Sequence, residues 1–303
     1  MKRATLLLSF VCVVALASFW MATELSWIAA ASLLFWHYAA LALLVAGICA
    51  VFVFKAWRKP VLVACVGVFA SYAAPLASDA LNNPPRKDRA SYKAISYNWL
   101  FSGTDRSAFY AWLTHEDPDI LSIQEFNKKD LAPLLASQPR SYFVSETRDD
   151  IVILSRYPLS EEKMDKVSTT RLVSVTAALP TGKLRVFGVH APTLRDVALL
   201  SQRNSYLAKI PDLLGASEAP RLVMGDFNST AWEPLIARLK ARARLHEAPR
   251  LIPLPTRMAV RRHLDIGSPI DHILASSAVH LGPCRTGPLM TSDHRPLICD
   301  FSF

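Results

Sequence analysis

The segment Leu222-Val223-Met224-Gly225-Asp226-Phe227-Asn228 joins a short apolar run to a polar turn. The apolar run stops at Gly225, and Asp226 and Asn228 follow on either side of Phe227. Residues two apart in an extended chain project to the same side, so the two polar side chains leave the turn together and Phe227 points away. The segment predicts a strand whose end presents two polar groups to one small target.

A second polar turn, Ser292-Asp293-His294-Arg295-Pro296, lies close to the C-terminus. It precedes another apolar run, Leu297-Ile298-Cys299, and so repeats the pairing of polar groups with a strand. Together, Asp226, Asn228, Asp293 and His294 suit the task of holding a metal ion and a water molecule beside a phosphorus atom.

Charge divides the 303-residue chain into two parts. Residues 1–83 hold only five of the 34 Lys and Arg residues and two of the 25 acidic residues. Three apolar runs fill this part, and each is long enough to cross ~30 Å of hydrocarbon. We predict a transmembrane region at 1–83 with helices at 4–22, 33–54 and 61–77, a linker at 84–90, and a catalytic domain at 91–303.

The basic residues of the first part predict its orientation. They lie at Lys2-Arg3 and at Lys55–Lys59, which flank alternate spans. Basic loops stay in the cytoplasm, so we expect a multi-pass protein of the inner or plasma membrane with its domain on the extracytoplasmic, periplasmic side. As an alternative, Met1–Ala17 is a cleavable signal peptide, which puts the domain on the same side.

Two cysteines of the predicted domain, Cys284 and Cys299, bracket the second polar turn. In an oxidising compartment they could form a disulfide. Spacing in the sequence does not bring two Cα atoms within disulfide range, so we expect two separate buried thiols.

Four apolar, strand-like runs of the domain end in polar residues: Tyr92–Tyr97 at Asn98, Ile120–Ile123 at Gln124-Glu125, Leu184–Val189 at His190, and Leu222–Met224 at Gly225-Asp226. Such strands bring their terminal residues to one rim of a sheet, where α/β folds bind ligands. The four ends therefore predict one shared site.

The remaining periodicity favours a particular fold class. Further strand candidates are Ile151–Leu154, Arg171–Leu179, Ile270–Ala275 and Leu297–Phe303, and helical periodicity covers Arg106–His115, Asp130–Ala136, Asp196–Leu214 and Trp232–Arg244. Strands outnumber helices and often follow one another directly. This pattern favours a two-sheet α/β sandwich with helices outside over a doubly wound single sheet.

Seven short motifs give the domain a family resemblance. They are Tyr97-Asn98-Trp99, Gln124-Glu125, Ile153–Pro158, Val189-His190, Gly225–Asn228, Ile270–Ile273 and Ser292–Pro296. In this order they resemble the endonuclease/exonuclease/phosphatase superfamily over residues 91–303. The resemblance implies a four-layer α/β sandwich, in which two packed mixed β-sheets are flanked by helices and the site lies at one edge.

The resemblance also implies roles for the polar residues. Glu125, Asn98 and Asp293 would hold Mg²⁺ or Mn²⁺, hard ions that take oxygen ligands. Asp226 would orient or deprotonate the attacking water, and Asn228 would hydrogen-bond the phosphate.

Two histidines would act beside them. His294 would pair with Asp271, whose carboxylate fixes the imidazole tautomer and favours the protonated form. His190 would bind across the phosphate and stabilise charge or assist the leaving oxygen. Either Asp226 or His294 could take the proton of the water, and Arg156 could bind substrate or form a structural salt bridge.

Each of these residues has a structural alternative. Asn98 and Asn228 could form turns, Asp271 could cap a strand end, and His190 could be a core histidine. Their joint occurrence in family order favours the functional reading.

The chain departs from the family pattern at three places, which are Leu100 where an acidic residue is common, Asp149-Asp150 where a glycine is usual, and Ala191-Pro192-Thr193 after His190. These departures argue against nuclease activity more than against phosphoester chemistry.

The favoured function is a membrane-anchored, divalent-metal-dependent phosphoesterase that hydrolyses phosphodiester or phosphomonoester bonds of lipid headgroups or small phosphoesters by in-line attack of water. A membrane-tethered nuclease acting on DNA or RNA is the first alternative, and a catalytically silent membrane interaction module is the second. A basic stretch with Arg238, Lys240, Arg242 and Arg244 could contact nucleic acid or anionic lipid, or could be a solvated helix face.

Overall fold

The computed structural model describes residues 22–85, 91–101, 106–145, 150–167, 169–215, 219–260 and 266–303. The first predicted span (4–22, except Ala22), the alternative signal peptide Met1–Ala17 and most of the predicted linker lie outside these residues. The domain boundaries therefore stay predictions.

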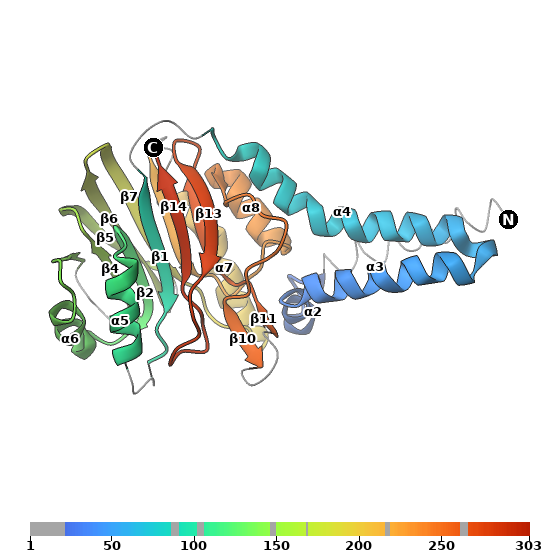
Figure 1. Ribbon diagram of the computed structural model, residues 1–303, viewed down its shortest axis with the longest axis horizontal. Helices are drawn as coiled ribbons and strands as arrows, with labels where there is room; N and C mark the ends of the chain where they lie inside the picture. Colours follow the sequence, from blue (N-terminus) through green and yellow to red (C-terminus); the bar gives the residue numbers. More distant parts are fainter. Residues whose placement is uncertain are drawn as a thin grey trace.

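The N-terminal part of the described chain is helical. It contains α2 (Trp27–Leu33), α3 (Trp36–Val53), the short 3₁₀ helix η1 (Lys55–Trp57) and α4 (Arg58–Asn82). Figure 1 shows α3 and α4 side by side, as a hairpin that projects away from the rest of the molecule.

Two helical segments, Trp36–Val53 and Lys55–Asn82, are long and apolar enough to cross a membrane, with mean hydropathies of 2.1 and 1.9. Core helices of soluble proteins can meet the same criterion, but such helices are mostly buried. Here only 17% and 6% of the two apolar windows are buried. Both segments overlap the predicted spans 33–54 and 61–77.

Two six-stranded mixed sheets form the body of the molecule (Figure 1). The first sheet has the order β13 (His280–Thr286), β14 (Leu297–Ser302), β1 (Tyr92–Asn98), β2 (Ile120–Phe126), β4 (Asp150–Ser155), β3 (Phe143–Val144). The second has the order β5 (Leu159–Val167), β6 (Thr170–Leu179), β7 (Gly182–His190), β8 (Arg221–Asp226), β12 (Asp271–Ser276), β9 (Leu245–His246). A separate hairpin pairs β10 (Arg257–Val260) with β11 (Ile266–Ser268).

Alternation along the strands explains the layers. In β8, Leu222 and Met224 enter the core between the sheets, whereas Val223 packs under α7 (Val197–Leu214) and α8 (Pro234–Ala243). In β1, Ala94 faces the inter-sheet core, and Ile95 and Tyr97 pack with α5 (Ser107–Glu116) and the region of α6 (Leu131–Ala136). Side chains alternate along a strand, so each sheet buries both faces. The expected four-layer α/β sandwich is confirmed.

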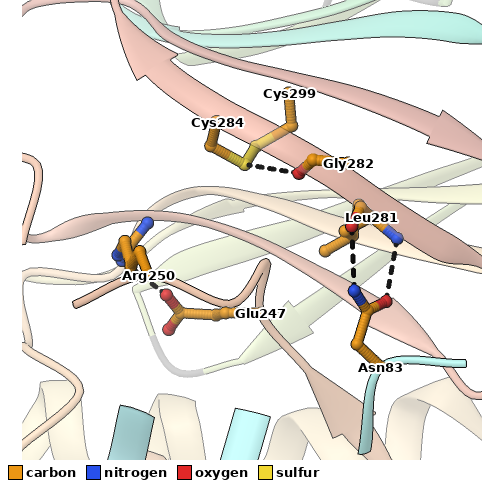
Figure 2. Close-up of a disulfide and its surroundings, with 7 residues drawn as sticks. All are labelled: Asn83, Glu247, Arg250, Leu281, Gly282, Cys284 and Cys299. Carbon is orange, nitrogen blue, oxygen red and sulfur yellow. Dashed lines mark hydrogen bonds and ion pairs between the residues drawn. A yellow bond between two sulfur atoms is a disulfide. The ribbon is translucent and has the colours of Figure 1, made fainter. Parts of the chain in front are cut away.

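The cysteine prediction was wrong. Cys284 and Cys299 are directly opposite each other on the antiparallel strands β13 and β14, with their Cα atoms 4.2 Å apart, and they form a disulfide (Figure 2). The spacing of the two residues in the sequence could not reveal this pairing, because the register of the two strands decides it.

Candidate active site

The candidate site lies where polar strand ends from both sheets meet. His190, at the end of β7, is paired in register with Asp226 of β8, and Asp226 is paired with Asp271 of β12. Asn98, at the end of β1, comes from the first sheet, and its side chain reaches Asp226 across the interior. A cavity of about 490 Å³ opens at this edge, and its lining includes Glu125, His190, Asp226 and His294.

The turn after β8 brings its two polar residues together. Gly225 has φ +152°, and a Cβ atom there would lie 1.8 Å from the carbonyl oxygen of Val189, so only glycine fits. Beyond it, the backbone N–H of Asn228 donates to Asp226 Oδ1 at 2.8 Å, and Asn228 Nδ2 donates to the carbonyl of Ala191 at 2.9 Å. Phe227 is buried in the core under α7 and α8. The opposite directions of Asp226 and Phe227 agree with the sequence prediction.

Asn98 connects two carboxylates of the site. Its Nδ2 donates to Glu125 Oε1 at 3.0 Å and to Asp226 Oδ2 at 3.1 Å, and its Oδ1 accepts from the N–H of Leu100. Glu125 lies within a register shift of β2, between Ile123 and Phe126, and has φ +52°. An irregularity of this kind re-aims a side chain relative to the pleat.

His294 is held between two buried aspartates. Its Nδ1 lies 2.8 Å from Asp271 Oδ2, and its Nε2 lies 3.8 Å from Asp226 Oδ2. Burial alone would lower the pKa of His294, but the charges of Asp271 and Asp226 outweigh burial and raise this pKa to about 9. Burial, followed by the charge of Asp271, raises the pKa of Asp226 to about 6.

His190 has a carboxylate partner that the sequence analysis did not assign to the site. Both carboxylate oxygens of Asp150 lie within 2.8 Å of His190 Nδ1, and Asp150 Oδ1 also accepts the N–H of Glu125 at 3.1 Å. Burial would lower the pKa of His190, but Asp150 outweighs it and raises this pKa to about 9. The only signal in the sequence was the departure at Asp149-Asp150; Asp149 itself lies outside the described residues.

Replacing Asp150 with asparagine should weaken the site without changing its shape. The amide keeps the size of the side chain but removes the charge that holds His190 protonated, so kcat at pH 8 should fall by roughly 10–100-fold. Asp165→Asn, at an ion pair with Lys163 on β5, is the matched control and should leave kcat unchanged. Equal rates for the wild type and Asp150→Asn across pH 6–9 would contradict this role.

Asp293 lines the same cavity and is partly exposed. Arg257 of β10 lies near it, with Nε 3.5 Å from Asp293 Oδ2, and the Met258 N–H donates to the Asp293 carbonyl. Arg257 of β10 therefore lines the cavity beside Asp293.

The residues of this edge fit a hard divalent cation. Glu125 and Asp293 offer carboxylate oxygens at the cavity. The Asn98 amide donates to both Glu125 and Asp226, and a cation bound near these carboxylates would likewise offset their negative charge. Candidate ligand atoms of Asp226, Asp271 and His294 also lie within 4.8 Å of one another, in a buried cluster. Because His294 and Asp271 already bond each other, the oxygen-rich side at Glu125 is the better fit.

The structure does not bring Arg156 to the site. It follows β4 at the end opposite to Asp150, and its guanidinium bonds to Asp117 and to the carbonyls of Arg140 and Ser141. The guanidinium also stacks on the ring of Tyr142, 3.5 Å from its centroid. These contacts match the structural alternative, and the substrate-binding prediction for Arg156 is corrected accordingly.

The basic stretch in α8 does not form an open cationic face. Lys240 is buried and bonds both carboxylate oxygens of Asp79 in α4 at 2.7 and 2.8 Å. Arg238 pairs with Glu24, and Arg242 pairs with Asp212. Part of this stretch is therefore an interface with the N-terminal helices, which none of the three sequence interpretations included.

The two paired mixed sheets, with polar residues gathered at the edge between them, define a four-layer α/β sandwich. Residues 95–294 match the model of the Endonuclease/Exonuclease/phosphatase family, and the chain belongs to this family. The predicted resemblance is thereby confirmed.

Solved structures share the fold at low sequence identity. An endonuclease/exonuclease/phosphatase from Beutenbergia cavernae DSM 12333 is 18% identical, with a TM-score of 0.59 over 70% of this chain and 72% of that one. D. rerio TDP2 complexed with a single-strand DNA product is 18% identical, with a TM-score of 0.59 over 71% and 100%. The mannosyl-6-phosphatase Bt3783 of Bacteroides thetaiotaomicron VPI-5482 is 16% identical, with a TM-score of 0.53 over 70% and 100%. No curated protein sequence matches the chain.

Proposed function

We propose that the protein is a membrane-anchored, divalent-metal-dependent phosphoesterase that cleaves its substrate by in-line attack of water. The observation that carries this proposal is the position of Asp226, whose carboxylate contacts Asn98 on one side and faces His294 on the other. A buried carboxylate with a pKa near 6, beside two cationic imidazoles, suits the activation of water next to an anionic phosphoryl group.

Different residues of the chain would carry out different parts of the reaction. Glu125 and Asn98, with Asp293 nearby, would hold Mg²⁺ or Mn²⁺, which when bound neutralises charge that develops on the phosphoryl oxygens. Asp226 would take the proton of the attacking water, because His294 is already protonated at neutral pH. The imidazolium groups of His294 and His190 would stabilise the phosphoryl oxygens and supply a proton to the leaving oxygen. Asn228 orients Asp226 through its backbone N–H.

The pH dependence of kcat/KM should be bell-shaped. The acid limb should lie near pH 6, where Asp226 loses its proton, and the alkaline limb near pH 9, where His294 and His190 lose theirs. Asp271 is the main charge that raises the pKa of His294, so Asp271→Asn should move the alkaline limb to lower pH. An alkaline limb that stays in place in Asp271→Asn would contradict the role of His294. Initial rates from pH 5 to pH 10 at saturating metal measure both limbs.

Membrane anchoring rests on the two exposed apolar helices. We propose the multi-pass, extracytoplasmic arrangement from the basic residues at Lys2-Arg3 and Lys55–Lys59, which flank alternate predicted spans. Two contacts favour a substrate at the membrane surface. The Thr230 hydroxyl donates to the carbonyl of Leu33, just before α3 begins, and the N–H of Gly267 in β11 donates to Tyr38 OH in the first turn of α3. The site therefore lies beside the end of a candidate span, which suits lipid headgroups.

A membrane-tethered nuclease is the second candidate. The TDP2 structure that shares this fold contains a single-strand DNA product, and a phosphodiester backbone would meet the same chemistry. The paired state of Arg238, Lys240 and Arg242 argues against a long basic track along α8.

One experiment separates the candidates. The full-length protein, in detergent micelles with Mg²⁺ or Mn²⁺, is assayed on phospholipid vesicles, sugar phosphates, plasmid DNA, RNA and bis(4-nitrophenyl) phosphate, with and without EDTA. We expect EDTA-sensitive hydrolysis that is lost in His294→Ala and kept in Arg242→Gln, whose ion pair is exposed. Cleavage of DNA alone would favour the nuclease. The absence of both activity and metal binding would favour the catalytically silent interaction module.

A further inference from the structure

The turn that carries Asp226 and Asn228 continues directly into contact with the N-terminal helices. Two residues after Asn228, Thr230 reaches Leu33 at the end of α2. Trp232 follows, with its indole N–H donating to the Tyr72 carbonyl of α4 at 3.0 Å. The indole is also stacked against the rings of His37 and Tyr72, each with a centroid distance of 5.6 Å.

A buried chain of charged groups joins the same two regions by a second route. Asp79 of α4 binds Lys240 of α8 and accepts the backbone N–H of Glu247 at 3.1 Å. Glu247 Oε1 lies 2.8 Å from Nδ1 of His272, and Nε2 of His272 lies 2.7 Å from the carbonyl of Ser229. All of these side chains are buried.

Both routes end at the site. Ser229 follows Asn228 in the chain, and His272 follows Asp271, which holds His294. Each nitrogen of the His272 ring faces an oxygen acceptor, so the ring links Glu247 to the turn after β8. Glu247 in turn is held by Asp79 and by Arg250. If the N-terminal helices served only as an anchor, the covalent chain would be enough to attach them. They also make buried contacts that lead to the site.

We propose that the docked ends of α2 and α4 hold the turn Asp226–Trp232 in its active geometry, with Asp79 and Trp232 as positioning residues. The N-terminal helices are then part of the working site and not only its anchor. The expected effect on kcat rests on the proposed phosphoesterase activity, whereas the expected effect on amide hydrogen exchange does not.

The test uses the full-length protein in detergent micelles and two disruptive variants, Asp79→Asn and Trp232→Ala. We expect kcat on bis(4-nitrophenyl) phosphate to fall at least tenfold while KM changes less than twofold. Amide hydrogen exchange of residues 226–232 should quicken at least tenfold, while the amides of β14 keep their protection and report an intact fold. Rescue is expected in Trp232→Phe, which keeps the ring. The double variant Asp79→Leu with Lys240→Met leaves no buried charge unpaired but removes the acceptor of the Glu247 N–H, so it should keep the fold and still lose kcat.

Glu24→Gln is the matched control, since it breaks an exposed ion pair to the same helix α8 and should leave both readouts within twofold. The inference is overturned if kcat stays within twofold in both disruptive variants, or if exchange at residues 226–232 is unchanged. A disruptive variant that loses β14 protection has unfolded, and the double variant then decides: lowered kcat and quickened exchange at residues 226–232 with β14 intact support the inference, and wild-type values of both overturn it. If the wild type hydrolyses nothing, the proposed function fails, and exchange at the turn alone decides this inference.

Discussion

Replacing Asp226 with asparagine is expected to lower kcat by about 10²–10⁴-fold, the usual contribution of a positioned general base. The amide has the same shape, so the Asn228 N–H keeps an oxygen acceptor at this position. The amide cannot take a proton from water at neutral pH. Steady-state rates of hydrolysis measure the loss, with Asp212→Asn, at an exposed ion pair, as the control that should retain full activity.

The acid limb of the pH profile separates this role from a merely structural one. If Asp226 is the base, the residual activity of Asp226→Asn should no longer fall between pH 7 and pH 5. A variant that keeps the acid limb near pH 6 would assign the proton transfer to another group. Full activity in Asp226→Asn would remove the central element of the proposed mechanism.

Replacing Arg203 with methionine is expected to destabilise the folded domain by about 3–5 kcal/mol. Arg203 in α7 bonds both carboxylate oxygens of Glu233, at 3.2 and 2.7 Å, and both side chains are almost fully buried. The substitution would leave the Glu233 carboxylate uncompensated in the interior. It would also remove the donor that bonds the Asn228 carbonyl at 2.8 Å.

Urea unfolding followed by tryptophan fluorescence measures this change. The control Arg242→Met breaks an exposed pair with Asp212 and should cost about 0–1 kcal/mol. The double variant Arg203→Met with Glu233→Leu should recover most of the loss, because no buried charge is then left unpaired. Equal destabilisation in the single and double variants would show that packing, and not charge, governs this site.

Much of the fold could be predicted from the sequence because its strands alternate or are continuously apolar. All eight strand candidates correspond to observed strands, as the run from Leu222 to Asp226 illustrates. β5 was missed because its exposed residues Ser160–Lys163 carry no apolar alternation. β13 was missed because Gly282 and Pro283 interrupt its run.

The candidate site was predictable where each strand brings one polar residue to its own end. Asn98, His190 and Asp226 follow this rule and meet at one edge of the sandwich. Asp150 did not follow it, because the residue begins its strand instead of ending it and has φ +89°. Its contact with His190 depends on the packing of two sheets, which a local pattern does not contain.

The docking of the helices was beyond sequence reasoning for a different reason. Asp79 and Lys240 are 161 residues apart, and each alone is typical of an exposed helix position. Only the tertiary arrangement identifies them as a buried pair. The Cys284–Cys299 disulfide depends in the same way on strand register.

The outer edge of the second sheet also affects how copies of this protein behave beside one another. β5 forms that edge, and its residues Ser160–Lys163 are exposed, with charges of both signs at Glu161, Glu162 and Lys163. An open strand edge invites a neighbouring chain to add its own strand, and charged side chains discourage such pairing. Where copies of the protein collide, this edge should therefore keep the molecules from aggregating through their sheets.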